Sequence, residues 1–220
     1  VFANEGTSGD KINLATDVAV TITGSAAAAD LTTINGGTTG LITATGVTTI
    51  TGTAAAVKAV IDAEADTGNA INLDTDFDVT ITPAGTAAAT DLSTINTETS
   101  GLVTATNVTN ITGTVAAVKA VTDAEGDTGN AINLDGDFTA TVSDTGSVAA
   151  SDLTSVSGKT TGNITATNVT TITGNASQVA TLISDEADTG NGVNLATNVK
   201  ATVTGSAAAA DLTTINGGTT

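Results

Sequence analysis

The stretch that decides the fold runs from Asp30 to Gly52 and reads D-L-T-T-I-N-G-G-T-T-G-L-I-T-A-T-G-V-T-T-I-T-G. Its first half returns at Asp91, Asp152 and Asp211, at intervals of about sixty residues, which indicates tandem repetition. A weaker copy lies within each interval, so the fundamental unit has about thirty residues. The first segment of each unit begins at Ile12, Ile42, Ile71, Val103, Ile132, Ile164 and Val193.

Two recurring glycines punctuate the repeat. The first precedes a residue that favours a helix N-cap, and an alanine- or valine-containing run follows. These pairs are Gly24-Ser25, Gly52-Thr53, Gly85-Thr86, Gly113-Thr114, Gly146-Ser147, Gly174-Asn175 and Gly205-Ser206. The second glycine follows Thr or Ser and predicts a turn before the next unit. It stands at Gly9, Gly40, Gly68, Gly101, Gly129, Gly162 and Gly190.

The residues between these glycines predict the local structure. Val103 to Gly113 is rich in Thr, Val and Ile, which predicts two short strands joined by a bend. Ala54 to Ile61 has apolar residues at three- and four-residue spacing, which predicts a short helix. Phe77 and Phe138 stand where sister units carry Val18 and Val199, so we expect both to fill the core.

These elements predict a repeat solenoid whose coils of about thirty residues run strand, bend, strand, short helix, with parallel β ladders along the axis. The alternative is an all-β parallel β-helix in which the alanine-rich segment forms a third strand. The helical version is favoured because alanine is a poor strand former and the caps recur. The prediction is a single uncapped solenoid over 1–220 with approximate coils 10–40, 41–68, 69–101, 102–129, 130–162, 163–190 and 191–220.

The composition excludes several classes of function. Against 23 acidic residues stand 5 lysines and no arginine, for a net charge of −18, which disfavours nucleic acids and anionic membranes as partners. The chain lacks His, Cys, Met, Trp and Tyr, so a Ser-His-Asp or Cys-His nucleophile cannot be assembled. No apolar stretch is long enough for a transmembrane segment. We expect no enzymatic activity and no required cofactor.

The two ends of the sequence suggest self-association. Thr23 to Thr39 is identical to Thr204 to Thr220, and neither end carries a polar, divergent coil that would cap a solenoid. The expected partner is therefore the protein itself, as a head-to-tail homopolymer or a longer repeat chain. The predicted function is structural, in an extracellular filament, sheath, surface layer or adhesin stalk, and the predicted location is extracellular or at the cell surface.

The unit from Asp30 to Gly52 and the motif D-T-G-N-A-I-N-L-D from Asp66 to Asp74 resemble a known class of repeats. They are similar to the Thr/Ala/Gly/Asp-rich tandem repeats of giant secreted or surface-attached bacterial proteins, including cyanobacterial ones. The similarity covers nearly the whole chain, and the strand-plus-helix unit is also similar to leucine-rich-repeat solenoids. The resemblance implies an extracellular setting, frequent calcium and no catalytic activity, although the glycine-rich nonapeptide calcium repeat of secreted toxins is not matched.

Calcium is the strongest candidate ligand. Asp74, Asp76 and Asp78 alternate along one predicted strand, and Asp135 and Asp137 repeat part of that pattern, which places carboxylates on one side as a hard cation prefers. The sister units carry alanine, threonine or asparagine at most of these positions, and the EF-hand spacing is absent. A solvated acidic face is therefore the competing interpretation.

Two further alternatives rest on hydroxyl and carboxylate patterns. Threonine pairs could form an ice-binding ladder, but asparagine, aspartate or alanine interrupts it in every other unit. The threonine pairs are Thr43/Thr45, Thr104/Thr106 and Thr165/Thr167, and the interruptions are Asn72/Asp74, Asn133/Asp135 and Asn194/Ala196. A polysaccharide-active β-helix enzyme could use Asp74 with Asp76, but no aromatic or arginine side chain is present to hold a sugar.

Overall fold

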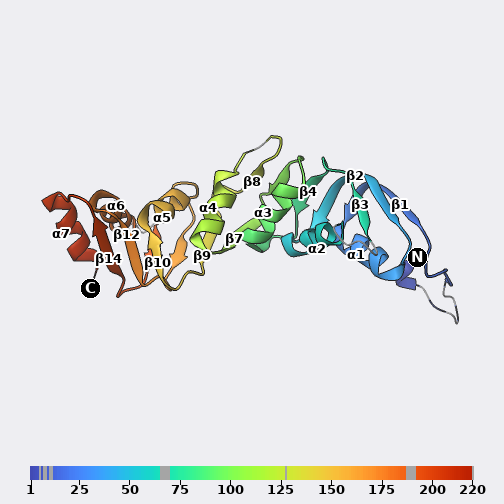
Figure 1. The fold of residues 1–220 in the computed structure, drawn as a ribbon, viewed down its shortest axis with the longest axis horizontal. Coiled ribbons are helices and arrows are strands. Elements are labelled where there is room, and N and C mark those ends of the chain that lie inside the picture. Colours follow the sequence, from blue (N-terminus) through green and yellow to red (C-terminus); the bar gives the residue numbers. More distant parts are fainter. Residues whose placement is uncertain are drawn as a thin grey trace. The chain divides into compact units, whose positions relative to one another are not determined.

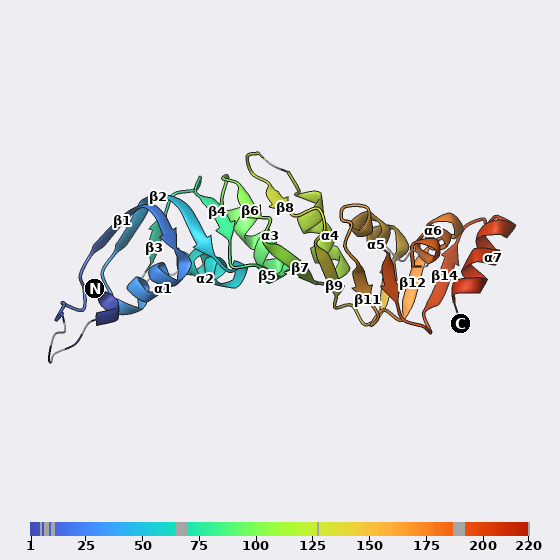
Figure 2. The same ribbon diagram turned by 180° about the vertical axis from the view of Figure 1, so that it is seen from behind.

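The computed structural model describes residues 1–4, 6, 9, 12–64, 70–126, 128–186 and 192–219. The described residues form an α/β fold in which three parallel sheets are built from strands that alternate with seven α-helices (Figures 1 and 2). They divide into two compact units. The first comprises Val1–Pro83, Thr94–Ala105 and Gly126–Asn133, and the second comprises Ala84–Ser93, Thr106–Glu125 and Leu134–Thr220.

The first unit is organised around a parallel sheet of order β1-β2-β4-β6-β8, with β3 pairing to β2. Its strands are β1 (Val20–Ala27), β2 (Ile42–Gly52), β3 (Ile71–Leu73), β4 (Asp78–Ile81), β6 (Val103–Ala105) and β8 (Ile132–Leu134). Its helices are η1 (Phe2–Asn4), α1 (Ala28–Gly37) and α2 (Ala54–Glu64). Helices α1 and α2 pack against each other and against β2, so strand and helix bury their apolar faces together.

The second unit holds two parallel sheets, of orders β13-β11-β9-β7-β5 and β10-β12-β14. The strands are β5 (Gly85–Ala88), β7 (Val108–Gly113), β9 (Thr139–Val142), β10 (Ser147–Ala149), β11 (Ile164–Ala166), β12 (Thr171–Asn175), β13 (Val193–Leu195) and β14 (Lys200–Thr204). The helices are α4 (Val115–Asp123), α5 (Ala150–Ser157), α6 (Ala176–Glu186) and α7 (Ala209–Gly218), each packed against the next. Helix α3 (Ala89–Glu98) contributes residues to both units.

The predicted solenoid of strand-bend-strand-helix coils is wrong, and so is the alternative all-β parallel β-helix. The described strands belong to three separate parallel sheets, and a helix of 8 to 11 residues follows each strand or group of strands, which makes the chain an α/β fold. The terms solenoid and β-helix therefore do not apply. The fold also gives no support to an extracellular or filamentous assignment. The solenoid prediction fails because the alanine-rich runs adopt different structures in alternate repeats.

In one set of repeats the predicted helix starts are confirmed. Thr53 Oγ1 accepts a hydrogen bond from the Ala56 N–H (3.2 Å), and Thr114 Oγ1 accepts one from the Ala117 N–H (3.2 Å). The Asn175 side chain accepts from the Gln178 N–H (2.9 Å), and Gln178 accepts from the Asn175 N–H (3.0 Å), which forms a reciprocal capping box.

In the other set the expected helix start is wrong. The chain continues as a strand after Gly24, Gly85 and Gly146, whereas after Gly205 residues 206–208 are neither strand nor helix. After Gly24, residues Ser25 and Ala26 pair with Thr49 and Ile50 of β2, and α1 begins only at Ala28. No side chain caps this helix. A neighbouring strand rich in Thr and Ile thus overrides the weak strand preference of alanine, since strand preference depends on cross-strand packing.

Strand pairing brings equivalent positions of successive repeats together. Ile42 lies opposite Ile71, and Ile164 lies opposite Val193, and all four are fully buried. Phe77 and Phe138 are 1% and 0% exposed, so the prediction that they fill the core is confirmed. The expected pair of strands across Val103 to Gly113 is also confirmed, as β6 and β7.

Three of the predicted turn glycines belong to a threonine-glycine clamp, whereas Gly68 and Gly190 lie outside the described residues. The clamps are formed by Thr38-Thr39-Gly40, Thr99-Ser100-Gly101 and Thr160-Thr161-Gly162. The first threonine of each is buried, and its hydroxyl donates to a carbonyl of the preceding turn: Thr38 to Val18 (2.6 Å), Thr99 to Phe77, and Thr160 to Phe138 (2.5 Å). The same hydroxyl accepts from the glycine N–H, at 2.9 to 3.0 Å. These two hydrogen bonds fix the turn to the preceding segment of the chain.

The glycine of the clamp has no room for a side chain. A Cβ atom on Gly162 would collide with the Asp137 and Phe138 carbonyl oxygens, which are backbone atoms and cannot rotate away. A Cβ on Gly136 would meet nothing within 4 Å. We therefore expect Gly162→Ala to destabilise the protein by about 2 kcal/mol, since the chain must shift to relieve the clash.

Urea unfolding monitored by circular dichroism measures this change, with Gly136→Ala as the matched control. The control should alter the free energy of unfolding by less than about 0.5 kcal/mol. Equal effects of the two substitutions would contradict the clamp.

Candidate functional site

The aspartates predicted to bind calcium are all exposed. Asp74 Oδ1 accepts a hydrogen bond from the Thr75 N–H (2.8 Å), and Asp78 Oδ1 accepts one from the Leu102 N–H (2.8 Å). Asp76 and Asp137 directly precede the buried Phe77 and Phe138, and Asp135 directly follows β8, three residues before Phe138. Within the described ranges, no group of three or more acidic side chains is placed to hold a metal ion. Calcium binding at these five residues stays a prediction.

Some aspartates instead satisfy backbone groups. The Asp78 carboxylate holds the amide of Leu102 at the start of the next repeat, and Asp144 Oδ2 accepts from the Val115 N–H (2.7 Å) at the first turn of α4. A carboxylate at that place is favoured by the orphan N–H groups and the positive end of the helix dipole. Sequence spacing did not reveal this role, because the partners are more than twenty residues apart.

Thr43, Thr45, Thr104 and Thr165 lie on strands, whereas Thr106 and Thr167 lie in the turns that follow β6 and β11. The parallel register also breaks the row. Thr43 lies opposite Asn72, and Thr165 lies opposite Asn194. Each threonine therefore neighbours an amide side chain in the next strand. The interruption expected from the sequence is thus present in the sheet.

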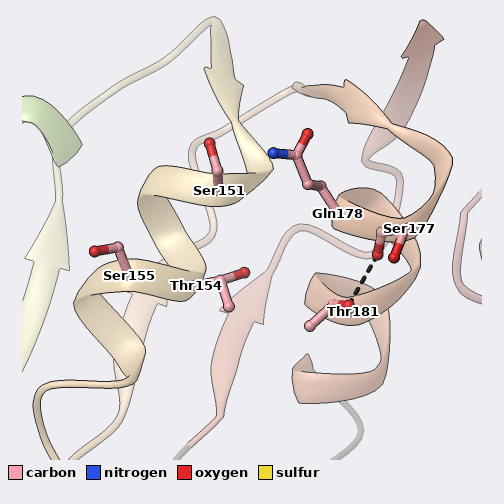
Figure 3. A pocket seen from close by; sticks show the side chains of 6 residues that line it. All are labelled: Ser151, Thr154, Ser155, Ser177, Gln178 and Thr181. Atoms are coloured by element: carbon pink, nitrogen blue, oxygen red, sulfur yellow. Dashed lines mark hydrogen bonds between the residues drawn. The ribbon is translucent and has the colours of Figure 1, made fainter. Parts of the chain in front are cut away.

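A groove with hydroxyl-bearing walls lies between α5 and α6. Its volume is about 350 Å³, and Figure 3 shows α5 on one wall and α6 on the other. The lining residues are Ser151, Thr154, Ser155, Ser177, Gln178 and Thr181. The groove forms because these short side chains leave space between the two helices.

The chemistry of this groove is that of neutral polar groups. The Thr154 hydroxyl donates to the Ala150 carbonyl (3.0 Å), and the Thr181 hydroxyl donates to the Ser177 carbonyl (2.8 Å), so both are already engaged by their own helices. The Gln178 amide nitrogen extends towards Ser151 in Figure 3. The lining includes no charged side chain, and the groove therefore offers no nucleophile–base pair and no anchor for an ion.

A second, acidic pocket lies in the first unit. Its volume is about 410 Å³, and it is lined by Ile61, Asp62, Glu64, Thr75, Thr94 and Glu98. Burial raises the pKa of Glu64, and the nearby Glu98 carboxylate raises it further, while a hydrogen bond from the Leu73 backbone lowers it. Glu186 in α6 is shifted in the same direction: burial raises its pKa, and a hydrogen bond from the Leu195 backbone lowers it.

These pKa directions give a pH dependence. Because the pKa of Glu64 is raised in the folded chain, the folded state takes up a proton more readily than the unfolded state, and ionised Glu64 costs stability at neutral pH. Glu64→Gln should therefore raise the Tm at pH 7, by less than about 3 °C for a chain of this size. The gain should vanish as the pH falls below the ordinary glutamate value of 4.5.

Thermal unfolding, followed by circular dichroism between about pH 3 and about pH 8, measures the change in Tm that Glu64→Gln causes. Glu186→Gln is the matched control, since it removes one negative charge from a similarly buried carboxylate whose pKa is not raised by a second carboxylate. Its gain should be smaller. A Glu64→Gln protein that is less stable than the parent at pH 7 would refute the assignment.

The lysines mostly pair with nearby carboxylates. Lys58 Nζ lies 2.6 Å from Asp62, and Lys119 Nζ lies 2.5 Å from Asp123, each one helical turn apart. Lys159 lies 4.0 Å from Glu125. The surface is therefore dominated by the excess of carboxylates. Among the described residues, no helix is long and apolar enough to cross a lipid bilayer.

The long, open strand edges are the remaining candidate feature. Strand β1 ends the sheet of the first unit, and β14 ends the three-stranded sheet of the second. Strand β1 has 8 residues and β14 has 5, whereas β5, β8, β10 and β13, at the other sheet ends, have 3 or 4. Neither β1 nor β14 contains proline, and Lys200 is their only charged residue. Proteins usually protect such edges with proline, charge or short length.

Next to β14, helix α7 exposes an apolar side chain. Leu212 is 47% exposed, although leucine is usually buried. This exposure could not be predicted from the sequence, because an identical segment forms α1, in which the equivalent Leu31 is buried.

Comparison of the chain with models of known protein families, with curated proteins and with solved structures finds no match. The functional conclusion therefore rests on the residues and their geometry.

Proposed function

We propose that this chain is a structural protein that associates with further copies of itself through the open edges of its parallel sheets. The observation that carries the proposal is the pair of long edge strands β1 and β14, which present unpaired backbone N–H and C=O groups. Such groups pair readily with a strand from another chain.

The side-chain chemistry supports a structural role. The chain lacks histidine, cysteine, tyrosine, tryptophan and arginine, so hydroxyl, amide, carboxylate and amine groups are the only reactive side chains. In the described part of the molecule several of these groups serve the fold, as in the threonine-glycine clamp and the Asp144 contact with α4. The extracellular or cell-surface location stays a prediction.

The acidic charge sets the conditions under which copies associate. With a net charge of −18, two copies repel each other, and this repulsion is screened as salt rises. We therefore expect association to strengthen between about 0.02 M and about 0.5 M sodium chloride, because the Debye length shortens.

Sedimentation velocity at increasing protein concentration tests the proposal. The average mass should rise above the 21.1 kDa of one chain, and the rise should be larger at high salt. A single 21.1 kDa species at every concentration and salt level would refute self-association.

A further inference from the structure

We propose that Asp135-Gly136 is a site of spontaneous isoaspartate formation, and that this modification loosens the threonine-glycine clamp at Thr160. The turn between β8 and β9 carries this reactive pair, and the equivalent turn between β3 and β4 carries an unreactive one. Neither turn takes part in the proposed self-association, so the modification stands apart from it.

The chemistry begins with a residue pair that occurs once. Asp135 is the one aspartate of the sequence that a glycine follows. In an Asp-Gly pair the glycine nitrogen can attack the carboxyl carbon of the aspartate side chain, because no Cβ beside that nitrogen obstructs the approach. The new C–N bond closes a succinimide ring, and the hydroxyl of the carboxyl group leaves with a proton as water.

Water then opens the succinimide in one of two ways. Addition at the main-chain carbonyl routes the backbone through the former side chain, which gives isoaspartate, whereas addition at the side-chain carbonyl returns aspartate. The water that was released is taken up again, so the product has the mass of the parent. The rearrangement needs no oxidant, reductant or enzyme.

The structure leaves this pair accessible. Asp135 directly follows β8, and both Asp135 and Gly136 are exposed in the turn that precedes the buried Phe138. A Cβ on Gly136 would meet nothing within 4 Å. The peptide between the two residues therefore has space to rotate as the ring closes, and solvent water reaches the ring that forms.

The equivalent turn of the first unit shows what glycine contributes. Asp74 directly follows β3, and Thr75 stands at the position of Gly136. The Thr75 N–H donates to Asp74 Oδ1 at 2.8 Å, so the nitrogen and the carboxylate are already close. The branched, stiff side chain of Thr75 lies beside the attacking nitrogen and obstructs ring closure. We therefore expect Asp135 to isomerise and Asp74 to stay intact.

Asparagine followed by glycine undergoes the same ring closure with loss of ammonia. Asn35-Gly36 and Asn216-Gly217 lie within α1 and α7, where the helical backbone turns the next nitrogen away from the side chain. Asn191 lies outside the described residues. Products at asparagine are heavier than the parent, because an amide becomes a carboxylate, so their mass distinguishes them from isoaspartate at Asp135.

Isoaspartate at this place disturbs the clamp because Gly136 is one of its acceptors. The Gly136 carbonyl accepts from the Thr161 N–H (2.9 Å) and hydroxyl (3.3 Å), and the Thr160 hydroxyl lies 3.4 Å away. The isoaspartyl link adds one carbon to the main chain just before Gly136. This carbonyl must then shift, and its hydrogen bonds to the following turn weaken.

Ageing of the full folded chain for several weeks at physiological temperature and pH, followed by peptide mass spectrometry, tests the proposal. Fragmentation by electron transfer cleaves the added carbon–carbon bond of isoaspartate and locates it in the sequence. Isoaspartate should accumulate at Asp135 at least about tenfold faster than at Asp74, because no branched side chain opposes ring closure. The modified protein, separated by chromatography, should have a Tm lower by about 2 to 4 °C.

Two variants exchange the residues of the two turns and serve as matched controls. Gly136→Thr should abolish isoaspartate at Asp135, and a Cβ at this position has room. Thr75→Gly should make isoaspartate appear at Asp74, where the nitrogen already lies close to the carboxylate. Circular dichroism and the Tm of each fresh variant establish that the fold is retained.

Three results would overturn the proposal. If the aged, folded parent carries no isoaspartate at Asp135, the site is wrong, and a sample aged in urea shows whether the folded turn protects it. If Asp74 isomerises as fast as Asp135, or Gly136→Thr keeps the modification, the glycine does not control the reaction. If the modified protein keeps the parent Tm, isoaspartate does not loosen the clamp.

Discussion

The threonine-glycine clamp is the constraint on which the rest of the structure depends. One buried hydroxyl donates to a carbonyl of the preceding turn and accepts the glycine N–H two residues later, so two backbone groups are fixed by one side chain. Neighbouring amides add to it, as when the Ser100 N–H donates to the Thr75 carbonyl (2.7 Å). Because the contact of Thr38 with Val18 fixes the turn before β2 to the segment before β1, it also sets the register of these parallel strands, in which Val20 lies opposite Ile42.

The α/β fold follows from how alternate repeats use the same residue types. In one set, a threonine or asparagine caps the helix at once, as Thr114 and Asn175 do. In the other set the residues after Gly24 and Gly146 stay in a sheet, and an uncapped helix starts at Ala28 or Ala150. The strands therefore separate into three sheets with helices between them. Buried apolar contacts, not capping, stabilise the second set of helices.

The functional argument has the same physical origin. A chain poor in reactive side chains uses its hydroxyls and several carboxylates for backbone hydrogen bonds, and what remains unsatisfied is backbone at the edges of β1 and β14 together with an exposed leucine on α7. The proposed self-association pairs these edge N–H groups with a strand of another copy. The high negative charge opposes it and makes ionic strength the controlling variable.

The sequence by itself determined the repeat, the turn glycines, the capped helix starts at Thr53 and Thr114, and the core positions of Phe77 and Phe138, because each depends on local chemistry or on apolar periodicity. It also determined the net negative charge and the absence of histidine, cysteine, tyrosine, tryptophan and arginine side chains. Only the tertiary structure decided that Ser25 and Ala26 lie in a strand, that the sheets are three, and that Asp78 and Asp144 hold distant backbone amides. Leu31 and Leu212 show why: identical local sequences are buried or exposed according to the neighbours that the fold brings against them, and those neighbours lie far along the chain.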